Sequence, residues 1–265
     1  MSGRQRIAAA FDAARADGRR AALMPYMMGG FPDLRRARAI GEAYVRAGAD
    51  LIELGFPFSD PLADGPVIHA AGVRALRAGV HVHDVLALGA ALAQDVPVVA
   101  MCYANPLLAL GAERFADGLA AAGISGLIVP DLPLEESDAV LEACDPRGVA
   151  LVPLAAPTTT PERLEAIGAR ARGFVYAVTL TGTTGERGRL DGSLAALIAR
   201  VRAATAVPVA VGFGIATAQQ VTAAADAGAD GVIIGSRLVR AVGEGEDVEG
   251  LVRSFAAALA QAASG

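Results

Sequence analysis

Eight short apolar segments recur along the chain, and they constrain its fold more than any other feature of the sequence. Most of them are apolar at consecutive positions, as expected for strands of a parallel sheet that helices cover on both faces. Segments with helical periodicity separate them, so a βα unit repeats along the chain. The predicted strands span residues 22–28, 51–55, 98–103, 126–129, 149–154, 174–178, 207–213 and 231–235.

A recurrent sequence motif marks the repeating βα unit. The sequence AGADLIELG at 47–55 is followed by the similar AGISGLIVPD at 122–131 and AGADGVIIGS at 227–236. Each motif is typical of a helix end, a glycine turn, a buried strand and then a polar residue or glycine after the strand. Eight such units without a linker predict a (β/α)8 TIM barrel that forms a single domain over residues 1–265. An open, doubly wound sheet is the alternative.

The N-terminal segment predicts an additional amphipathic helix. Ile7, Phe11 and Ala14 recur at helical spacing and are expected to be buried. Asp12 and Asp17 interrupt the apolar run that a signal peptide needs. We therefore expect a cytoplasmic protein.

The composition disfavours several kinds of partner. Charge, Pro or Gly interrupts every apolar stretch before 18 residues, so no membrane span is predicted although 54% of the residues are hydrophobic. The net charge of -5, without a basic cluster interleaved with aromatic residues, argues against nucleic acid. Cys102 and Cys144 are the only cysteines and form no CxxC, which disfavours disulfides and a thiolate zinc site. All 23 basic residues are Arg, so neither a lysine Schiff base nor a P-loop is available.

Glu53 is a carboxyl group near the C-terminal end of an otherwise apolar strand. Period-two alternation places it on the same side as Leu51 and Gly55, which we expect to face the barrel interior. Desolvation at the barrel mouth would raise its pKa and suit it to carry a proton in both directions. The alternative is a structural carboxylate paired with an Arg, but no Arg is adjacent in sequence.

The loop FPFSDPLADGPVI follows this strand and contains Asp60 and Asp64. Asp-Pro and Asp-Gly are also ordinary turn sequences. Placed after Glu53, however, Asp64 is a candidate second catalytic carboxylate. One buried and one loop carboxyl group can hold different protonation states near neutral pH.

Glycines after the last two predicted strands indicate a phosphate site. VGFGIAT at 211–217 brings Gly214, and IIGSRLV at 233–239 brings Gly235 and Ser236, which can open a short helix. Backbone N–H groups at such a helix start favour an anion. GFGIAT also resembles a dinucleotide motif, but Asp230 precedes the next strand instead of ending it, so we disfavour that interpretation.

Two further segments have alternative interpretations. The Gly-rich stretch at 179–192 is either a surface loop or, as we favour at this barrel face, a lid that contacts substrate through Thr184. His81 and His83 form an HxH at a predicted helix start without an evident third ligand, so no metal is expected. His69 is interpreted as structural, and Cys102 as buried and inert.

The loop PFSDPLADGP after LIELG closely resembles the signature of the tryptophan synthase α subunit family. PYMMGGFPD at 25–33, CYANPL at 102–107, VPDLPLEES at 129–137, the Thr-rich loop, GFGI and GS follow in the family's order. The resemblance covers nearly the whole chain, while the first and last helices match only generally. One departure is Tyr26, where other members often carry Phe.

The resemblance implies retro-aldol cleavage of indole-3-glycerol phosphate to indole and glyceraldehyde 3-phosphate. Glu53 matches the family's acid–base carboxyl group, which protonates C3 of the indole ring. Asp64 matches the carboxylate that accepts a hydrogen bond from the indole N–H. The indole ring itself serves as the electron sink, which fits the absence of lysine. A sugar-phosphate isomerase barrel is the alternative enzyme, and a regulatory subunit with little activity is the alternative class.

The resemblance also implies the residues that bind substrate and partner. Tyr176 matches a family active-site tyrosine, with Tyr26, Tyr103, Leu127 and Phe213 as walls for the indole ring. The phosphate positions match Gly185, Gly214, Gly235 and Ser236. No cofactor is expected in this chain. The expected partner is a pyridoxal-phosphate β subunit in an α2β2 heterotetramer, which would dock through Pro57, Asp60, Asn105 and Pro106.

Overall fold

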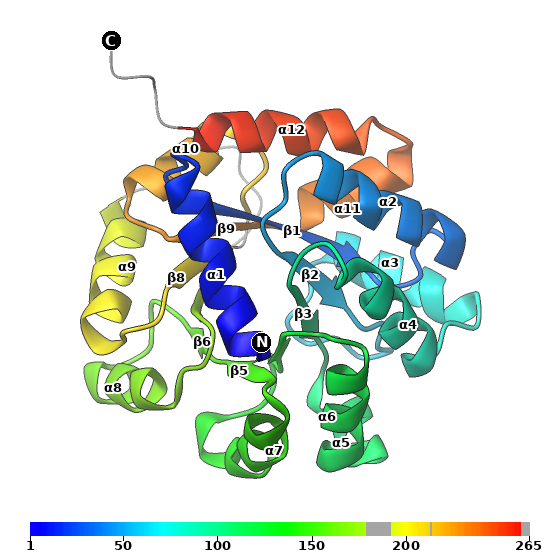
Figure 1. Ribbon diagram of the computed structural model, residues 1–265, viewed down its shortest axis with the longest axis horizontal. Helices are drawn as coiled ribbons and strands as arrows, with labels where there is room; N and C mark the ends of the chain where they lie inside the picture. The colour runs from blue at the N-terminus through cyan, green and yellow to red at the C-terminus, as the bar shows by residue number, and fades with distance from the viewer. Residues whose placement is uncertain (179–191, 213, 261–265) are drawn as a thin grey trace.

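The computed structural model describes residues 1–178, 192–212 and 214–260, and it forms the predicted (β/α)8 TIM barrel (Figure 1). Its paired strands are all parallel and follow the order β5-β4-β3-β2-β1-β9-β8-β7-β6. The strands are β1 (Ala22–Met28), β2 (Ile52–Gly55), β3 (Val98–Met101), β4 (Gly126–Ile128), β5 (Ala150–Val152), β6 (Leu154–Ala155), β7 (Val175–Val178), β8 (Val209–Gly212) and β9 (Gly231–Ile234).

The predicted strand at 149–154 is divided into β5 and β6 at Pro153. Proline has no N–H to donate to a strand partner. β5 pairs with β4 on one side, and β6 pairs with β7 on the other. The carbonyl oxygen of Pro153 still accepts a hydrogen bond from the Tyr176 N–H at 2.9 Å. Together β5 and β6 therefore occupy one strand position, and the nine described strands form a barrel with eight strand positions.

Helices alternate with the strands and surround the sheet (Figure 1). Side chains cap two of the helix starts: Asp33 accepts a hydrogen bond from the Arg36 N–H at 2.9 Å, and Thr160 caps the helix that begins with Pro161. The helices are α1 (Gly3–Ala16), α2 (Leu34–Arg46), α3 (Pro66–Arg77), α4 (Val82–Leu92), α5 (Ala104–Leu110), α6 (Ala112–Ala121), α7 (Asp138–Cys144), α8 (Pro161–Arg170), α9 (Gly192–Ala204), α10 (Ala218–Asp226), α11 (Ser236–Glu244) and α12 (Val248–Leu259), with short 3-10 helices η1 (Leu134–Glu136) and η2 (Asp145–Arg147).

Within the described ranges, no single helix is long and apolar enough to cross a membrane. Helices α3 and α4 meet that criterion only when taken together, and they are bent by 112° relative to each other.

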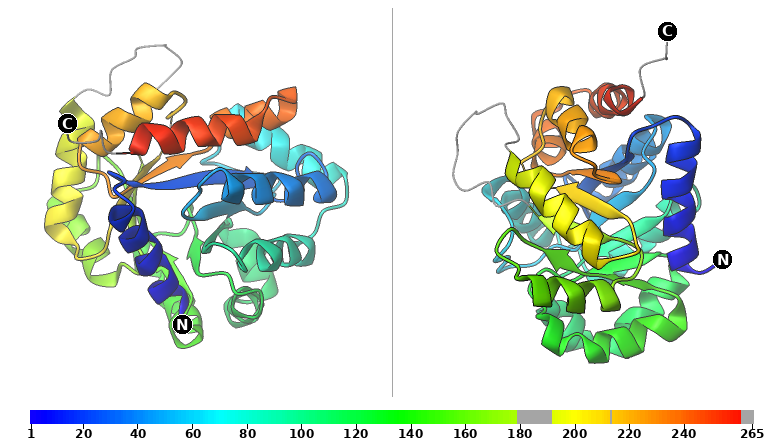
Figure 2. Two further views of the ribbon diagram at one scale, coloured as in Figure 1. Left: turned by 45° about the horizontal axis from the view of Figure 1, so that its top comes forward. Right: turned by 90° about the vertical axis from the view of Figure 1, so that its left-hand side faces the viewer.

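The additional helix α1 closes the N-terminal end of the barrel. Ile7, Phe11 and Ala14 are buried, as predicted, against side chains of the barrel interior. The rings of Phe11 and Phe174 lie 6.0 Å apart, and a Cβ on Gly231 would come within 2.9 Å of the Phe11 ring. Figure 2 shows from two further directions that α1 lies at one end of the barrel. The opposite, C-terminal end is where a site can open.

The strands alternate between the barrel interior and the outer helices. Met24 and Leu51 pack in the interior cluster, whereas Leu23, Ile52 and Leu54 pack in the larger cluster that includes helix residues. Because side chains alternate along a strand, this fixes Glu53 on the inner face of β2. The fold therefore delivers a carboxyl group to the interior near the C-terminal mouth.

Candidate active site

A cavity of about 520 Å³ opens at the C-terminal mouth of the barrel. It brings together the predicted catalytic carboxyl groups and three of the predicted phosphate residues, which are far apart in the sequence. A larger hollow of about 760 Å³ beside α7 and α8 has no carboxyl group in its lining, so we place the chemistry in the mouth cavity. The lining residues of the mouth cavity are Tyr26, Glu53, Ala63, Asp64, Gly65, Ile68, Met101, Tyr176, Gly214, Ile233, Gly235 and Ser236.

Glu53 lies on the inner face of β2, where it is directly opposite Tyr26 of β1. Its side chain is almost fully buried, with 2% of the residue exposed. Burial, and then the nearby charge of Asp64, raises the pKa of Glu53 to about 8. Its Oε2 atom is buried and has no hydrogen-bond partner among the described residues. Glu53 is therefore mainly protonated at neutral pH.

Asp64 lies on the loop between β2 and α3, in a different setting. Burial raises the pKa of Asp64, while a hydrogen bond from the Tyr103 hydroxyl and the charge of His69 act in the opposite direction. Tyr103 also accepts a hydrogen bond from the Ala63 N–H at 3.1 Å and stacks on Phe58 at a centroid distance of 5.4 Å. The two carboxyl groups thus differ in their environment, since in the part of the chain that the structure describes Glu53 has no hydrogen-bond donor to Oε2, whereas Asp64 has one in Tyr103.

Sequence reasoning missed what Tyr103 and His69 do here. Tyr103 was expected to be a wall for the indole ring, and His69 to be purely structural. Tyr103 acts on Asp64 because the loop after β2 and the loop after β3 meet at the mouth, whereas His69 acts on it from the first turn of α3. No spacing in the sequence signals such a contact between two separate loops.

Three of the predicted phosphate residues, Gly214, Gly235 and Ser236, line the cavity near the start of α11. Gly235 is the N-cap of this nine-residue helix, and Ser236 is its first residue. Gly214 has φ +76°, a left-handed conformation that favours glycine. N–H groups at a helix N-terminus point outward and attract anions. This side of the cavity is therefore suited to a phosphate.

Two tyrosines line the cavity in the same way, each across a glycine of a neighbouring strand. The Tyr26 ring lies over Gly55, where a Cβ would come within 2.7 Å of the tyrosine Cζ. Tyr176 lies over Gly212 of β8, where a Cβ would come within 2.8 Å of its Cε2. Burial raises the pKa of both phenols well above the usual value. Both hydroxyls stay neutral and can donate hydrogen bonds.

Leu127 does not line the cavity, so its prediction as a pocket wall is wrong. It pairs with Ala100 and packs in the outer core, whereas Ile128, the next residue, faces the barrel interior. The strand is apolar on both faces, and its sequence therefore does not reveal which residues point inward. The predicted site residues Thr184, Gly185 and Phe213 lie outside the described residues.

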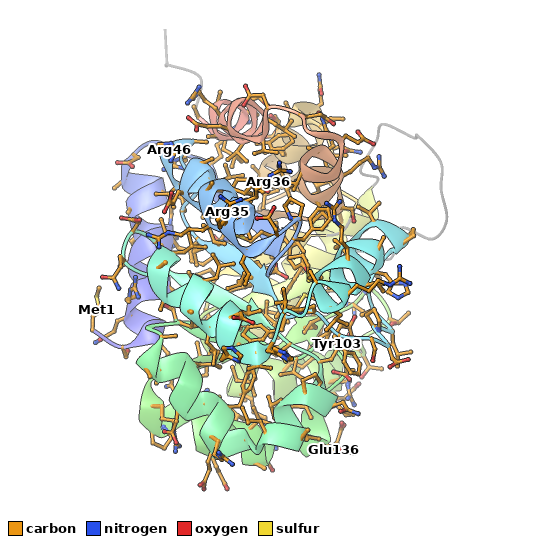
Figure 3. All side chains as sticks on the ribbon, turned by 90° about the vertical axis from the view of Figure 1, so that its right-hand side faces the viewer. Met1, Arg35, Arg36, Arg46, Tyr103 and Glu136 are labelled. Atoms are coloured by element: carbon orange, nitrogen blue, oxygen red, sulfur yellow. The ribbon has the colours of Figure 1, made fainter. Side chains whose placement is uncertain are left out.

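The predicted partner-binding residues lie around this mouth, with Pro57 and Asp60 on the loop after β2 and Asn105 and Pro106 in the first turn of α5. Asp60 and Asn105 are exposed, while Pro57 and Pro106 are partly exposed. Tyr103 is the N-cap of α5, the helix that carries Asn105 and Pro106. Figure 3 shows Tyr103 on the side of the molecule away from Met1 and α1.

Two other sequence features lie away from this cavity. His81 is the N-cap of α4, and its ring stacks on that of His83 at 5.6 Å. Among the described residues, no group of three or more His, Cys, Asp or Glu side chains is arranged to hold a metal ion. Cys102 is buried, and its burial raises the pKa of the thiol to about 12.

A (β/α)8 barrel with a buried carboxyl group and an anion-attracting helix start at its C-terminal mouth has the architecture of a barrel enzyme that acts on phosphorylated compounds. Comparison with known proteins identifies the enzyme family. The family model for the tryptophan synthase alpha chain matches residues 11–263, and the chain belongs to this family. Members of the family are lyases that cleave indole-3-glycerol phosphate in tryptophan biosynthesis.

Relatives and solved structures agree with this assignment. The tryptophan synthase alpha chain of Synechocystis is 49% identical over 247 residues, which cover 92% of this chain and 93% of the relative. That of Methanosarcina mazei is 45% identical over 256 residues, 97% of this chain and 93% of the relative. A Mycobacterium tuberculosis tryptophan synthase structure has a TM-score of 0.91 at 42% identity and covers 97% of this chain and 99% of its own.

Proposed function

We propose that this chain cleaves indole-3-glycerol phosphate in the mouth cavity, with Glu53 as the group that protonates the indole ring. The observation that carries the proposal is a carboxyl group with 2% exposure and a pKa of about 8 on the inner face of β2. Such a group holds a proton at neutral pH and can transfer it to a substrate atom.

The chemistry requires a proton on C3 of the indole ring. The Glu53 O–H bond breaks, a C3–H bond forms, and the ring becomes positively charged. The bond between C3 and the glycerol side chain can then break toward the ring, as the hydroxyl on the departing carbon gives its proton to a water molecule and becomes the aldehyde. Glu53 remains as a carboxylate. Indole and glyceraldehyde 3-phosphate are the products.

Asp64 would stabilise the positive ring by accepting a hydrogen bond from the indole N–H. The Tyr103 hydroxyl donates to Asp64, and His69 adds a favourable charge, so both support its ionised form. The phosphate would bind to the N–H groups near Gly214, Gly235 and Ser236. Thr184 and Gly185 remain predictions, as a lid contact and a phosphate contact.

Replacing Asp64 by Asn is expected to lower turnover by about ten- to a hundred-fold, because the amide carries no negative charge toward the ring. Indole release from indole-3-glycerol phosphate measures the effect. Asp95→Asn, an exposed carboxyl group next to β3 at the closed end, is the control and should leave the rate unchanged. Equal rates for Asp64→Asn and the unmodified protein would exclude the proposed role of Asp64.

The chain would act with a β subunit that carries pyridoxal phosphate and consumes the indole, in an α2β2 complex in the cytoplasm. Indole is small and apolar and would diffuse away unless it passed directly to a second site. The barrel mouth is suited to protein docking because two exposed leucines lie beside the predicted interface residues. Leu62, on the loop that carries Asp60, is 89% exposed, and Leu108, on α5, is 60% exposed. Two buried free cysteines are compatible with a reducing compartment.

Binding of the β subunit is expected to raise the rate of indole-3-glycerol phosphate cleavage. The β subunit would contact Asp60 and the first turn of α5, where Tyr103 joins α5 to Asp64. Docking would therefore order the carboxylate that contacts the indole ring, and the coupling is reciprocal in binding free energy. Steady-state rates with and without saturating β subunit measure the gain.

The interface variants Asp60→Ala and Asn105→Ala should reduce this gain more than they reduce the basal rate. Asp12→Ala, on the exposed face of α1 at the closed end of the barrel, is the control and should keep the full gain. An unchanged rate in a complex whose formation is confirmed by sedimentation would refute the coupling while leaving the lyase assignment intact.

A further inference from the structure

The two carboxyl groups of the site differ in their hydrogen-bond donors. Asp64 receives a hydrogen bond from the Tyr103 hydroxyl. Glu53 has a buried Oε2 atom without a partner in the described part of the chain. This arrangement suits a protonated Glu53, but the proposed proton transfer leaves a buried carboxylate. An ionised carboxyl group without donors is costly in a buried site, so a donor is needed at that stage.

Tyr26 is the phenol next to Glu53. The two residues are paired on adjacent strands, and both side chains lie on the inner face. The ring of Tyr26 extends across Gly55, the residue two positions beyond Glu53 on the same face of β2. These two β2 positions are about 6.6 Å apart along the strand. A Glu53 side chain that points toward the mouth thus approaches the Tyr26 hydroxyl.

Gly55 makes this placement possible. A Cβ there would overlap the Tyr26 hydroxyl and lie 2.7 Å from the tyrosine Cζ, closer than real Cβ atoms approach other atoms. A side chain at position 55 would therefore displace the hydroxyl. Because Gly55 has no side chain, the Tyr26 phenol can lie in the cavity.

We infer that Tyr26 is a positioning residue whose hydroxyl donates a hydrogen bond to the carboxylate that Glu53 becomes after it protonates the ring. The inference rests on the proposed role of Glu53. It assigns one tyrosine to each carboxyl group, Tyr103 to Asp64 and Tyr26 to Glu53. It also assigns a role to the hydroxyl of Tyr26, at a position where other family members often carry Phe.

Asp64 and Tyr176 also lie near Glu53, but neither is placed as Tyr26 is to donate a hydrogen bond to it. Asp64 raises its pKa from the loop after β2, and Tyr176 is close enough for the Glu53 charge to affect its own pKa. Tyr176 projects from β7, which is not a neighbour of β2 in the sheet, and its ring lies over Gly212 instead. Tyr26 is the phenol in register with Glu53 on an adjacent strand. It also faces Asp64 and Tyr103, whose charges raise its pKa further.

Tyr26→Phe removes only the hydroxyl and tests the inference. We expect kcat for indole release to fall about ten-fold, as for the loss of one hydrogen bond to a charged group, with a smaller change in KM. The hydrogen bond stabilises ionised Glu53, so its loss should raise the pKa of that group. The high-pH limb of the rate profile should therefore move to higher pH. Tyr44→Phe is the matched control, because Tyr44 is fully buried in α2 and its hydroxyl has no hydrogen-bond partner among the described residues.

The outcomes separate this inference from the proposed function. An inactive Glu53→Gln protein, together with a Tyr26→Phe protein that keeps the original kcat and pH profile, would overturn the role of Tyr26 alone. A loss confined to KM would overturn it too, because that pattern belongs to uniform substrate binding. A fully active Glu53→Gln protein would instead remove the proposed function on which the inference depends.

Discussion

Replacing Glu53 by Gln is expected to lower the rate of indole-3-glycerol phosphate cleavage by about two to four orders of magnitude, while the barrel stays folded. Gln has the shape of the protonated carboxyl group, but its amide N–H is far too weak an acid to protonate C3. The cavity walls should be unaffected, so substrate binding should change far less than turnover. Single-turnover indole release by the purified chain measures the loss without interference from product release.

The same substitution should make the protein more stable at pH 7. Burial raises the folded-state pKa of Glu53 from 4.5 to about 8, so ionisation of the unfolded chain above pH 4.5 favours unfolding. This penalty grows between pH 4.5 and 8 and is absent below pH 4.5. At pH 7 it amounts to about 3 kcal/mol, which Glu53→Gln would remove.

Urea unfolding at pH 4 and pH 7 tests this stability effect. The difference between Glu53→Gln and the unmodified protein should be small at pH 4 and large at pH 7. Glu142→Gln, at an exposed position on α7, should differ from the unmodified protein by less than about 0.5 kcal/mol at both values. A folded Glu53→Gln protein with full activity would exclude the acid role, and an equal stability gain at both pH values would contradict the raised pKa.

Replacing Gly235 by Asp is expected to weaken phosphorylated ligands by about two to three orders of magnitude. The substitution places a negative charge at the start of α11, where we propose that the phosphate binds, and like charges in contact cost several kcal/mol. A Cβ fits at this position, because its nearest neighbour would be Ile68 Cδ1 at 3.5 Å. The effect is therefore electrostatic and not steric.

Inhibition constants of the two products distinguish an effect on the phosphate site from an effect on the indole pocket. Glyceraldehyde 3-phosphate should bind much more weakly to Gly235→Asp, whereas indole should bind nearly as before. Gly235→Ala adds the Cβ without the charge and should change neither inhibition constant by more than about three-fold. If Gly235→Asp weakened both products equally, the phosphate site would have to lie elsewhere.

The sequence was sufficient to predict the barrel and the position of Glu53. Consecutive apolar residues in short strands, separated by helical segments, predict a parallel sheet that is covered on both faces. In β2 the single carboxyl group, with Leu51 before it and Gly55 after it, indicates which face points inward. The resemblance to family motifs then predicts the catalytic roles of Glu53 and Asp64. These features are local, since each depends on residues that are near one another in the chain.

Tertiary structure decided the features that depend on distant contacts. In β4, Gly126, Leu127 and Ile128 show no alternation of polarity, so only packing reveals that Ile128 and not Leu127 faces inward. The hydroxyl of Tyr103 reaches Asp64 because the loops after two neighbouring strands meet at the mouth.

Burial of Glu53 is likewise a property of the closed barrel. Glu53 is 2% exposed on the inner face of β2, and the Tyr26 ring lies across Gly55 on the same face. The sequence by itself determined which groups are available for catalysis. Closure of the barrel determined which of them are desolvated, because the solvation of a charge depends on everything that surrounds it in space.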